Sequence, residues 1–183
     1  TPGPDASAPR PDAAAPGFDA AAPGLDAPSA GPDASTSICT GAGCVRPSTC
    51  PSGAKPARFV AQTPPGTLEP SAQASCSVTF ANCGSKVWNA ATSLGAASGF
   101  KLGSQAPQDN YTWGSNRFLL PADVPVGYEV TVPFTVLALA SSGTYPFSFG
   151  ILEESVAWLQ EPSLVVQVDV ADQGGPVTLC AGV

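Results

Sequence analysis

The feature that most restricts the fold of this chain is a period of two in the apolar residues of its C-terminal two thirds. Apolar side chains recur at every second position in residues 76–80, 128–136, 145–151 and 164–170. Successive side chains of a β-strand point to opposite faces, so each run predicts a strand with one buried face. Turn signals rich in Gly, Pro, Asn and Ser separate the runs. No segment has a convincing helical period.

Residues 59–183 are therefore predicted to form one all-β domain, an antiparallel β-sandwich. Shorter strands are expected at residues 58–62, 99–103, 116–120 and 177–180. Pro133 lies on the face of its strand opposite the apolar residues. Because proline has no N–H to donate to a sheet, Pro133 predicts an edge position or a bulge there.

A tandem repeat occupies residues 1–35, where Asp recurs every seven residues from Asp5 to Asp33. A seven-residue period is typical of coiled coils, but eight prolines in this stretch exclude a continuous helix. Ala, Pro, Gly and Asp supply 28 of the 35 residues, which leaves nothing to build a core. We expect a disordered or polyproline-II tether that reaches on the order of 100 Å at ~3.1 Å per residue. Ordering of the repeat by a partner is the alternative.

Phe18 and Leu25 interrupt the repeat, because they replace the proline that opens two of its units. One interpretation is drift within a low-complexity sequence. The other is a pair of apolar anchors, seven residues apart, that dock on a neighbouring subunit.

Six cysteines without a single histidine favour disulfides formed in an oxidising compartment. Three lie in a neck at residues 36–58 and three in the folded region: Cys39, Cys44 and Cys50, then Cys76, Cys83 and Cys180. If all six pair, at least one bridge must join the neck to the domain. Cys76 and Cys83 are poor partners, since a strand between them would separate them by roughly 23 Å, and a disulfide needs Cα atoms within about 7 Å.

Charge and composition exclude several classes of function. The net charge is -7, and residues 59–183 carry three scattered cations, too few for a phosphate-binding surface, so no nucleic-acid partner is expected. Without histidine the usual general base is missing, and no nucleophile, phosphate-loop or metal-ligand motif occurs, so we expect neither an enzyme nor a cofactor. No apolar run approaches the roughly 18–20 residues that span a bilayer.

A tryptophan-centred block at residues 99–121 identifies a candidate family. It reads GFKLGSQAPQDNYTWGSNRFLLP, follows Asn-Cys-Gly at 82–84 and Trp88, and precedes Pro-Val-Gly at 125–127, Gly-Thr-Tyr at 143–145 and Trp158. The stretch 59–170 thereby resembles the four-tryptophan (FW) domain, the immunoglobulin-like module of an autophagy cargo receptor and of many bacterial secreted and surface proteins. The resemblance implies an immunoglobulin-like sandwich with a protein-binding role. The chain departs from the pattern in having three tryptophans, with Phe149 where the family often carries a fourth.

The candidate ligand-binding residues of that block are Gln108, Asp109, Asn110, Trp113 and Arg117. They form either a polar ligand surface around an aromatic ring or an internally bonded loop. In the second interpretation Trp113 plugs one end of the sandwich, Asp109 and Asn110 cap the loop, and Arg117 pairs with Asp109. We favour the second. We expect Trp88 and Trp158 to be core residues, and the alternative is an exposed aromatic platform for binding.

The combined features predict a non-enzymatic extracellular module for binding or adhesion, displayed at the cell surface on a flexible tether. We expect a bacterial chain whose secretion or lipoprotein segment has been removed. Its partner would be a surface protein or glycan. The alternative is a structural subunit of a surface filament or coat, in which the N-terminal tail or an edge strand links neighbouring copies.

Overall fold

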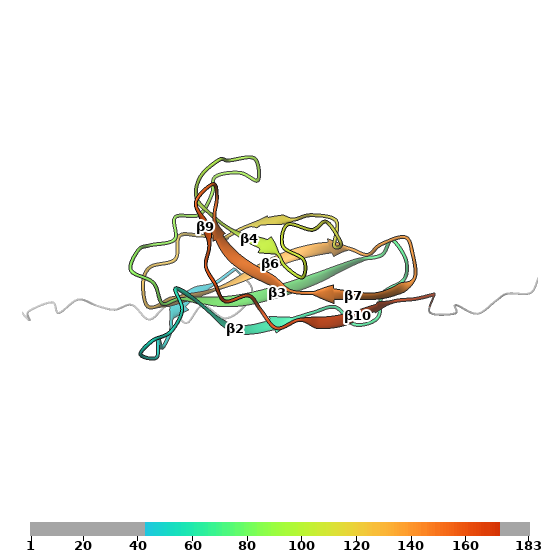
Figure 1. Cartoon of the computed structure of the whole chain (residues 1–183), viewed down its shortest axis with the longest axis horizontal. Coiled ribbons are helices and arrows are strands. Elements are labelled where there is room, and N and C mark those ends of the chain that lie inside the picture. The colour runs from blue at the N-terminus through green and yellow to red at the C-terminus, as the bar shows by residue number, and fades with distance from the viewer. Residues whose placement is uncertain (1–42, 173–183) are drawn as a thin grey trace, which may run out of the picture. The chain divides into compact units, whose positions relative to one another are not determined.

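A computed structural model describes residues 43–172 of the 183-residue chain, and these residues belong to one compact unit that begins at Thr36 (Figure 1). The expected tether at 1–35, the anchors Phe18 and Leu25, Cys39, Cys180 and the expected strand at 177–180 all lie outside the described residues.

The described residues contain ten strands and no helix, which confirms the all-β prediction. The strands are β1 (Val45–Pro47), β2 (Ala57–Thr63), β3 (Gln73–Asn82), β4 (Phe100–Ser104), β5 (Arg117–Leu119), β6 (Tyr128–Leu137), β7 (Gly143–Phe147), β8 (Phe149–Glu153), β9 (Ala157–Trp158) and β10 (Val166–Val170). One sheet has the order β1-β6-β3-β2 and another β5-β4-β8-β9, while β7 pairs with β10. Every strand pair is antiparallel, and the arrangement is a β-sandwich.

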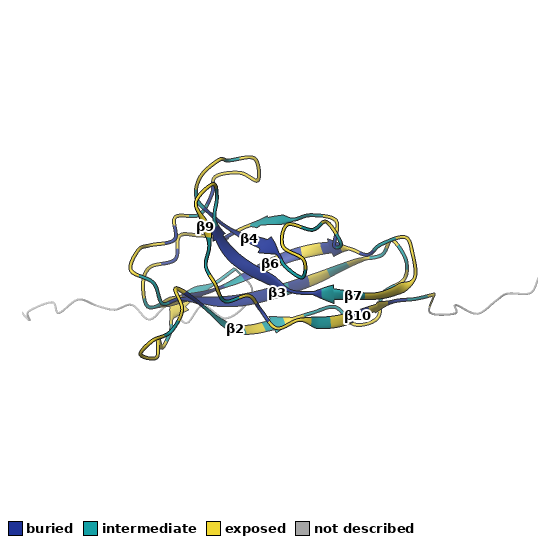
Figure 2. Cartoon of the chain, in the orientation of Figure 1, coloured by how far each residue is buried: buried dark blue, intermediate teal, exposed yellow. Residues whose placement is uncertain are grey.

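The core lies between the sheets and consists of the alternating residues that the sequence assigned to buried faces (Figure 2). On β3 the buried face carries Val78 and Phe80, and on β6 the alternate valines are fully buried. The alternation fails at strand ends, where Tyr128 and Leu164 are exposed. Phenylalanine rings fill the centre, with centroids 4.4–4.9 Å apart in the closest pairs: Phe118 with Phe134, Phe134 with Phe149, and Phe147 with Phe149. Such tilted and edge-on pairs are the geometries that aromatic rings prefer.

Pro133 occupies a stretch of β6 that is an edge on one side. The Thr131 N–H donates to the Cys44 carbonyl at 3.2 Å, and residues 128–130 of β6 pair with β1. In an antiparallel strand alternate residues direct their hydrogen-bonding groups to the same side, so position 133 faces the side that β1 no longer covers. Among residues 43–172 no strand pairs with this side of Pro133, so its missing N–H leaves no ladder bond unmade there, as its sequence position predicted.

The alternation at residues 145–151, which predicts one strand, belongs to two. β7 pairs with β10, and after Ser148 the chain continues as β8, which pairs with β4. The Ser148 hydroxyl donates to the Ser163 carbonyl at 2.9 Å, and the Phe149 N–H donates to the Ser163 hydroxyl at 3.0 Å. These bonds to the segment before β10 replace ladder bonds at the point where the strand changes partners.

The neck contributes a strand to the sandwich in addition to a disulfide. Its strand β1, absent from the sequence prediction, extends the sheet next to β6. Cys50 is bonded to Cys83 just beyond the end of β3, a neck-to-domain bridge of the kind expected from the distribution of the cysteines. Cys44 is disulfide-bonded as well.

Cys76 corrects the expectation that all six cysteines form disulfides, because it is a free, buried thiol. It lies on the inward face of β3 with Val78 and Phe80, paired in register with Phe134 of β6. Burial raises the pKa of the Cys76 thiol to about 11. The alternation of apolar residues, which places Cys76 on the buried face of its strand, therefore predicts its environment correctly. The even number of cysteines, which suggested a disulfide, does not.

Candidate functional site

The loop between β4 and β5 is held by the side chain of Asn110. The Asn110 Nδ2 donates to the carbonyls of Gln105 at 3.0 Å and Pro107 at 2.5 Å, and its Oδ1 accepts from the Thr112 N–H at 2.9 Å. The Ser104 hydroxyl donates to the Asn110 carbonyl at 2.7 Å. A side-chain amide that bonds its own loop in this way replaces the ladder bonds of a strand. Asn110 is therefore a loop-organising residue.

Arg117 joins that loop to the end of β8. Its Nη1 lies 2.5 Å from the Asp109 Oδ1, and its Nε lies 3.3 Å from the Glu154 Oε2. The same Glu154 oxygen lies 3.1 Å from the Lys101 Nζ. The Arg117 guanidinium also lies 5.2 Å from the centroid of the Trp158 ring, within the range of a cation–π contact. The predicted Arg117–Asp109 pair thus exists, within a larger network.

Lys101 is the buried cation of this network, with 1% of its surface exposed. Its Nζ donates to the carbonyls of Leu94 at 2.8 Å and Ala96 at 2.7 Å in addition to the Glu154 contact, so three partners satisfy its three protons. Burial raises the pKa of Glu154, but hydrogen bonds and charge from Lys101 and Arg117 outweigh burial and hold that pKa below 4.5. The network is therefore charged and internally neutralised at neutral pH.

Trp113 is a core residue, as the internal interpretation of the block predicts. It is 2% exposed, and its indole N–H donates to the Pro146 carbonyl at 2.9 Å. Its ring contacts those of Tyr145 and Phe147 edge-on. Trp88 is buried too and stacks on Phe100. Neither ring is available to a ligand.

Trp158 departs from the prediction that it belongs to the core, because it is half-buried on the edge strand β9. Its ring lies over Gly103 of β4, where a Cβ would collide with the ring and with Leu152. Two hollows share Trp158 as a wall, and Arg117 lines one of them. We call the hollow lined by Arg117, Glu153 and Glu154 the ionic hollow. The indole stands between it and a second hollow.

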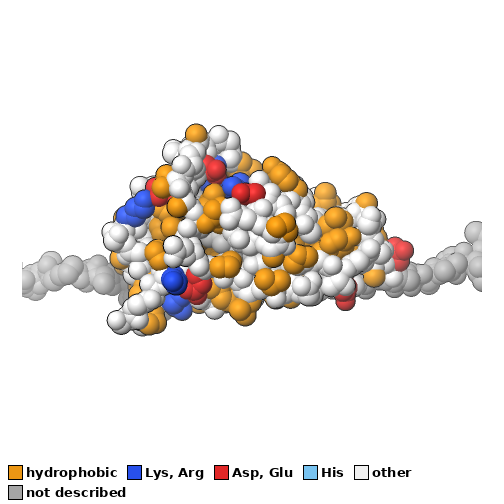
Figure 3. Space-filling view, viewed as in Figure 1, with side chains coloured by type: hydrophobic (Ala, Val, Ile, Leu, Met, Phe, Trp, Pro, Cys, Tyr) orange, Lys and Arg blue, Asp and Glu red, His pale blue; other side chains and the backbone are white. Residues whose placement is uncertain are grey.

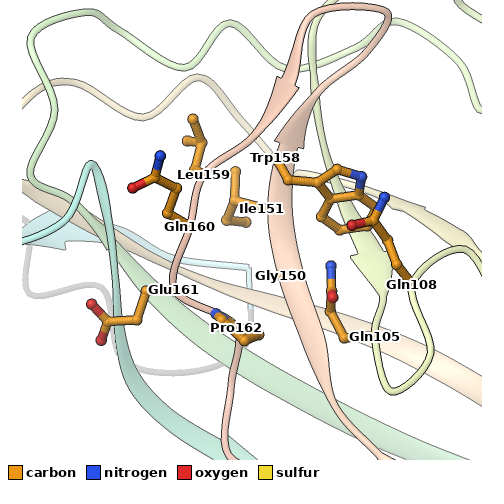
Figure 4. Close-up of a pocket in the computed structure, with 9 residues that line it drawn as sticks. All are labelled: Gln105, Gln108, Gly150, Ile151, Trp158, Leu159, Gln160, Glu161 and Pro162. Carbon is orange, nitrogen blue, oxygen red and sulfur yellow. The ribbon is translucent and has the colours of Figure 1, made fainter.

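The second hollow, which we call the glutamine hollow, has a volume of about 140 Å³ (Figure 4). Its lining residues are Gln105, Gln108, Gly150, Ile151, Trp158, Leu159, Gln160, Glu161 and Pro162. Figure 4 shows the Trp158 ring with Gln105 and Gln108 on one side of β8 and the segment 159–162 on the other. None of the lining residues is Lys or Arg.

Gly150 forms the floor of the glutamine hollow. A Cβ built on it would lie 3.4 Å from the Gln105 Nε2 and 3.6 Å from the Trp158 Cε3, which is ordinary van der Waals contact. The bare glycine thus leaves open the space between the amide and the indole. An alanine would fill that space without straining the strand.

Of the five residues predicted for the site, Gln108 lines the glutamine hollow. Asp109 and Arg117 lie in the ionic network, Asn110 fixes the loop that carries Gln105 and Gln108, and Trp113 is in the core. The remaining lining residues were not predicted. Their weak signal is a polar run with one tryptophan, Trp158 to Glu161, next to a strand end.

Between residues 43 and 172 there is no group of three or more His, Cys, Asp or Glu side chains placed to hold a metal ion. In the same part of the chain no helix is long and apolar enough to cross a membrane. No protein-family model matches the chain, and a search of curated proteins found none similar to it. The FW resemblance therefore stays a prediction, whereas the sandwich itself is observed.

Proposed function

We propose that this chain is a non-enzymatic, extracellular module of the cell surface that binds its ligand in the glutamine hollow. The observation that carries this proposal is a half-buried tryptophan flanked by neutral amides, beside the bare glycine Gly150. Binding sites combine an apolar or aromatic wall with a few polar groups that fix orientation, and the glutamine hollow has both. The Cys50–Cys83 bridge is compatible with an oxidising, extracellular location.

The charged side chains support binding over catalysis. Glu153 pairs with Lys86, Glu154 with Lys101 and Arg117, and Glu161 accepts the Phe59 N–H at 3.1 Å. Carboxylates committed to ion pairs and backbone bonds are poor acids or bases, since a catalytic group needs a pKa near the working pH. On the face seen in Figure 3 basic side chains lie beside acidic ones rather than forming a patch, which also argues against nucleic acid.

The alternative, a filament or coat subunit, gains less support from the described strands. Addition of a neighbouring strand needs a long open sheet edge. The outer strands β1 and β5 have three residues each, β9 has two, and the open stretch of β6 contains Pro133. On β2 the Phe59 N–H is already occupied by Glu161. Of the two five-residue strands that pair with each other, β10 is bonded on its outer side to Leu68 and β7 contains Pro146. The edges of the described strands are therefore short or partly occupied, which favours a ligand over a strand-exchanging neighbour.

Binding of the full-length chain to bacterial envelope fractions tests the proposal. We expect saturable binding that Gly150→Ala weakens and that the matched variant Gly66→Ala leaves unchanged, because a Cβ at Gly66 meets open space. Equal binding by both variants, or none by the wild type, would contradict it. Light scattering on full-length protein and on residues 36–183 tests the alternative. Fixed oligomers that disappear with the tail would make the chain an assembly subunit.

A further inference from the structure

The glutamine hollow has a chemistry that selects among ligand classes, an inference that rests on the proposed binding function. Gln105 and Gln160 make no side-chain hydrogen bonds to other described residues, and Gln108 makes one long contact of 3.4 Å to Asp109. Each amide has two N–H donors and a carbonyl oxygen whose two lone pairs can accept. The hollow therefore offers donors and acceptors in equal supply, which matches hydroxyl groups, because they also donate and accept.

Charge excludes the ionic ligands. With no Lys or Arg in its lining, the glutamine hollow has nothing to neutralise a phosphate, sulfate or carboxylate. Its single carboxylate, Glu161, accepts a backbone N–H from β2, and Figure 4 shows that carboxylate directed away from Trp158, so it provides no opposite charge for a cation placed on the ring. The cations of this region lie on the other side of Trp158, in contact with Glu154 and Asp109. A neutral ligand is the one that binds here without a desolvated, unpaired charge.

The aromatic wall gives the ligand a second requirement. The π face of an indole is electron-rich and attracts polarised C–H groups laid flat on it. Arg117 supports Trp158 from the ionic hollow, so the ring is held in place without a ligand. A molecule that fits must therefore have a flat array of C–H groups on one face and hydroxyls at its rim. A pyranose ring has both.

Size sets the extent of the ligand. About 140 Å³ is well below the roughly 300–1,000 Å³ of sites that enclose drug-sized molecules. It suits one ring and leaves the rest of a larger molecule in solvent. We propose that the glutamine hollow binds a single neutral sugar ring, stacked on Trp158 and hydrogen-bonded by Gln105 and Gln108, which lie on the same side of β8 as the indole, as the end of a surface glycan.

The three tryptophans of the chain make a direct test possible, because each indole N–H gives one signal in an ¹H–¹⁵N spectrum. The full-length protein is titrated with methyl glycosides of glucose, galactose, mannose and N-acetylglucosamine, with sorbitol and glucuronate as non-ring and anionic controls. A ligand of about 12 heavy atoms at ~0.3 kcal/mol each gives a dissociation constant of a few millimolar. We expect at least one glycoside to shift the Trp158 signal saturably, with Trp88 and Trp113 unmoved, and both controls to be inactive.

Two variants locate the binding. Gly150→Ala, which fills the floor, and Gln105→Ala, which removes an amide without adding volume, should each weaken the glycoside at least about fivefold, roughly 1 kcal/mol. Gly66→Ala should leave it unchanged. The idea is overturned if no glycoside moves the Trp158 signal at about 100 mM, well over tenfold above the expected constant, or if sorbitol moves it equally.

Treatment of the envelope fraction distinguishes two outcomes: that the ligand is not a sugar, and that the chain is not a binding module. Periodate, which destroys sugar diols, should abolish capture of the protein, whereas protease should not. Capture that depends on Gly150 but survives periodate and is lost on proteolysis would keep the binding module and replace the glycan by a protein. Absence of capture would remove both.

Discussion

At the level of single residues, Cys76 shows how its surroundings decide the chemistry of a thiol. The thiolate is the reactive form, and burial raises the pKa of Cys76 to about 11, far above neutral pH. We expect Cys76 to react with maleimide at least ~100-fold more slowly in native protein than in denaturant. Timed labelling followed by peptide mass mapping measures this residue apart from the other cysteines. Rapid native labelling of its peptide would show that β3 is not packed as described.

Glu154 should make the acid side of the stability curve steep. Its folded pKa lies below 4.5, so the unfolded chain binds its proton first as the pH falls. The contribution is fully present above about pH 4.5, the unfolded value, and is lost as the pH falls through the lower folded pKa. Urea unfolding of Glu154→Gln at several pH values should show a flatter profile below that point.

The same variant should also lose about 2 kcal/mol at neutral pH, because it deprives buried Lys101 of a charged partner. The neighbouring Glu153→Gln is its control. Its partner, the Lys86 side chain, is 59% exposed, and exposed pairs contribute under about 1 kcal/mol. Equal losses from the two variants would mean that burial of Lys101 does not set the strength of the network.

The sequence located the polar contacts of the block correctly where the partners are close in the chain. Asn110 caps its own loop, and Arg117 reaches Asp109 eight positions away. Trp158 could not be predicted in the same way. Its placement depends on Gly103 in β4 and Gly150 in β8, which pair directly across the two strands and leave room for one edge of the ring. Such a site becomes visible when three strands are assembled.

At the level of elements, alternation predicted which faces of β3 and β6 are buried because both strands have a core on one side. It could not show that residues 145–151 change sheets, since the inward face stays apolar on both sides of Ser148. The three-residue β1 and two-residue β9 were missed because they are too short to establish a period.

The Cys50–Cys83 bridge is the element-level device that holds the neck to the end of β3. It closes a loop across 33 positions, and bridges of this span typically contribute about 2–4 kcal/mol, mainly by restricting the unfolded chain. The double variant Cys50→Ala/Cys83→Ala should therefore unfold at lower urea by that amount. An unchanged midpoint would mean that pairing of β1 with β6 suffices without the bridge.

At the level of the whole molecule, the boundary of the folded unit separates the repeat, residues 1–35, from the neck, which belongs to the same unit as the sandwich. The compact unit begins at Thr36, whereas the sequence alone places the start of the sandwich at residue 59. The difference matters because β6 carries a buried carboxylate, Glu129, whose oxygens accept from Arg46 at 2.6 Å and from the Ser48 hydroxyl at 2.7 Å. Both donors lie in the neck.

Two truncations should consequently differ. Deletion of residues 1–35 removes no residue of that unit, so the urea midpoint should equal that of the full chain. Deletion of residues 1–58 removes β1 and the bridge to Cys83, and leaves Glu129 buried without its donors, so the loss should exceed the ~3 kcal/mol typical of a disulfide alone. Restoring residues 43–58 should restore the midpoint. If the chain from residue 59 were as stable as the one from 36, the neck would be an accessory to the sandwich rather than part of its sheet.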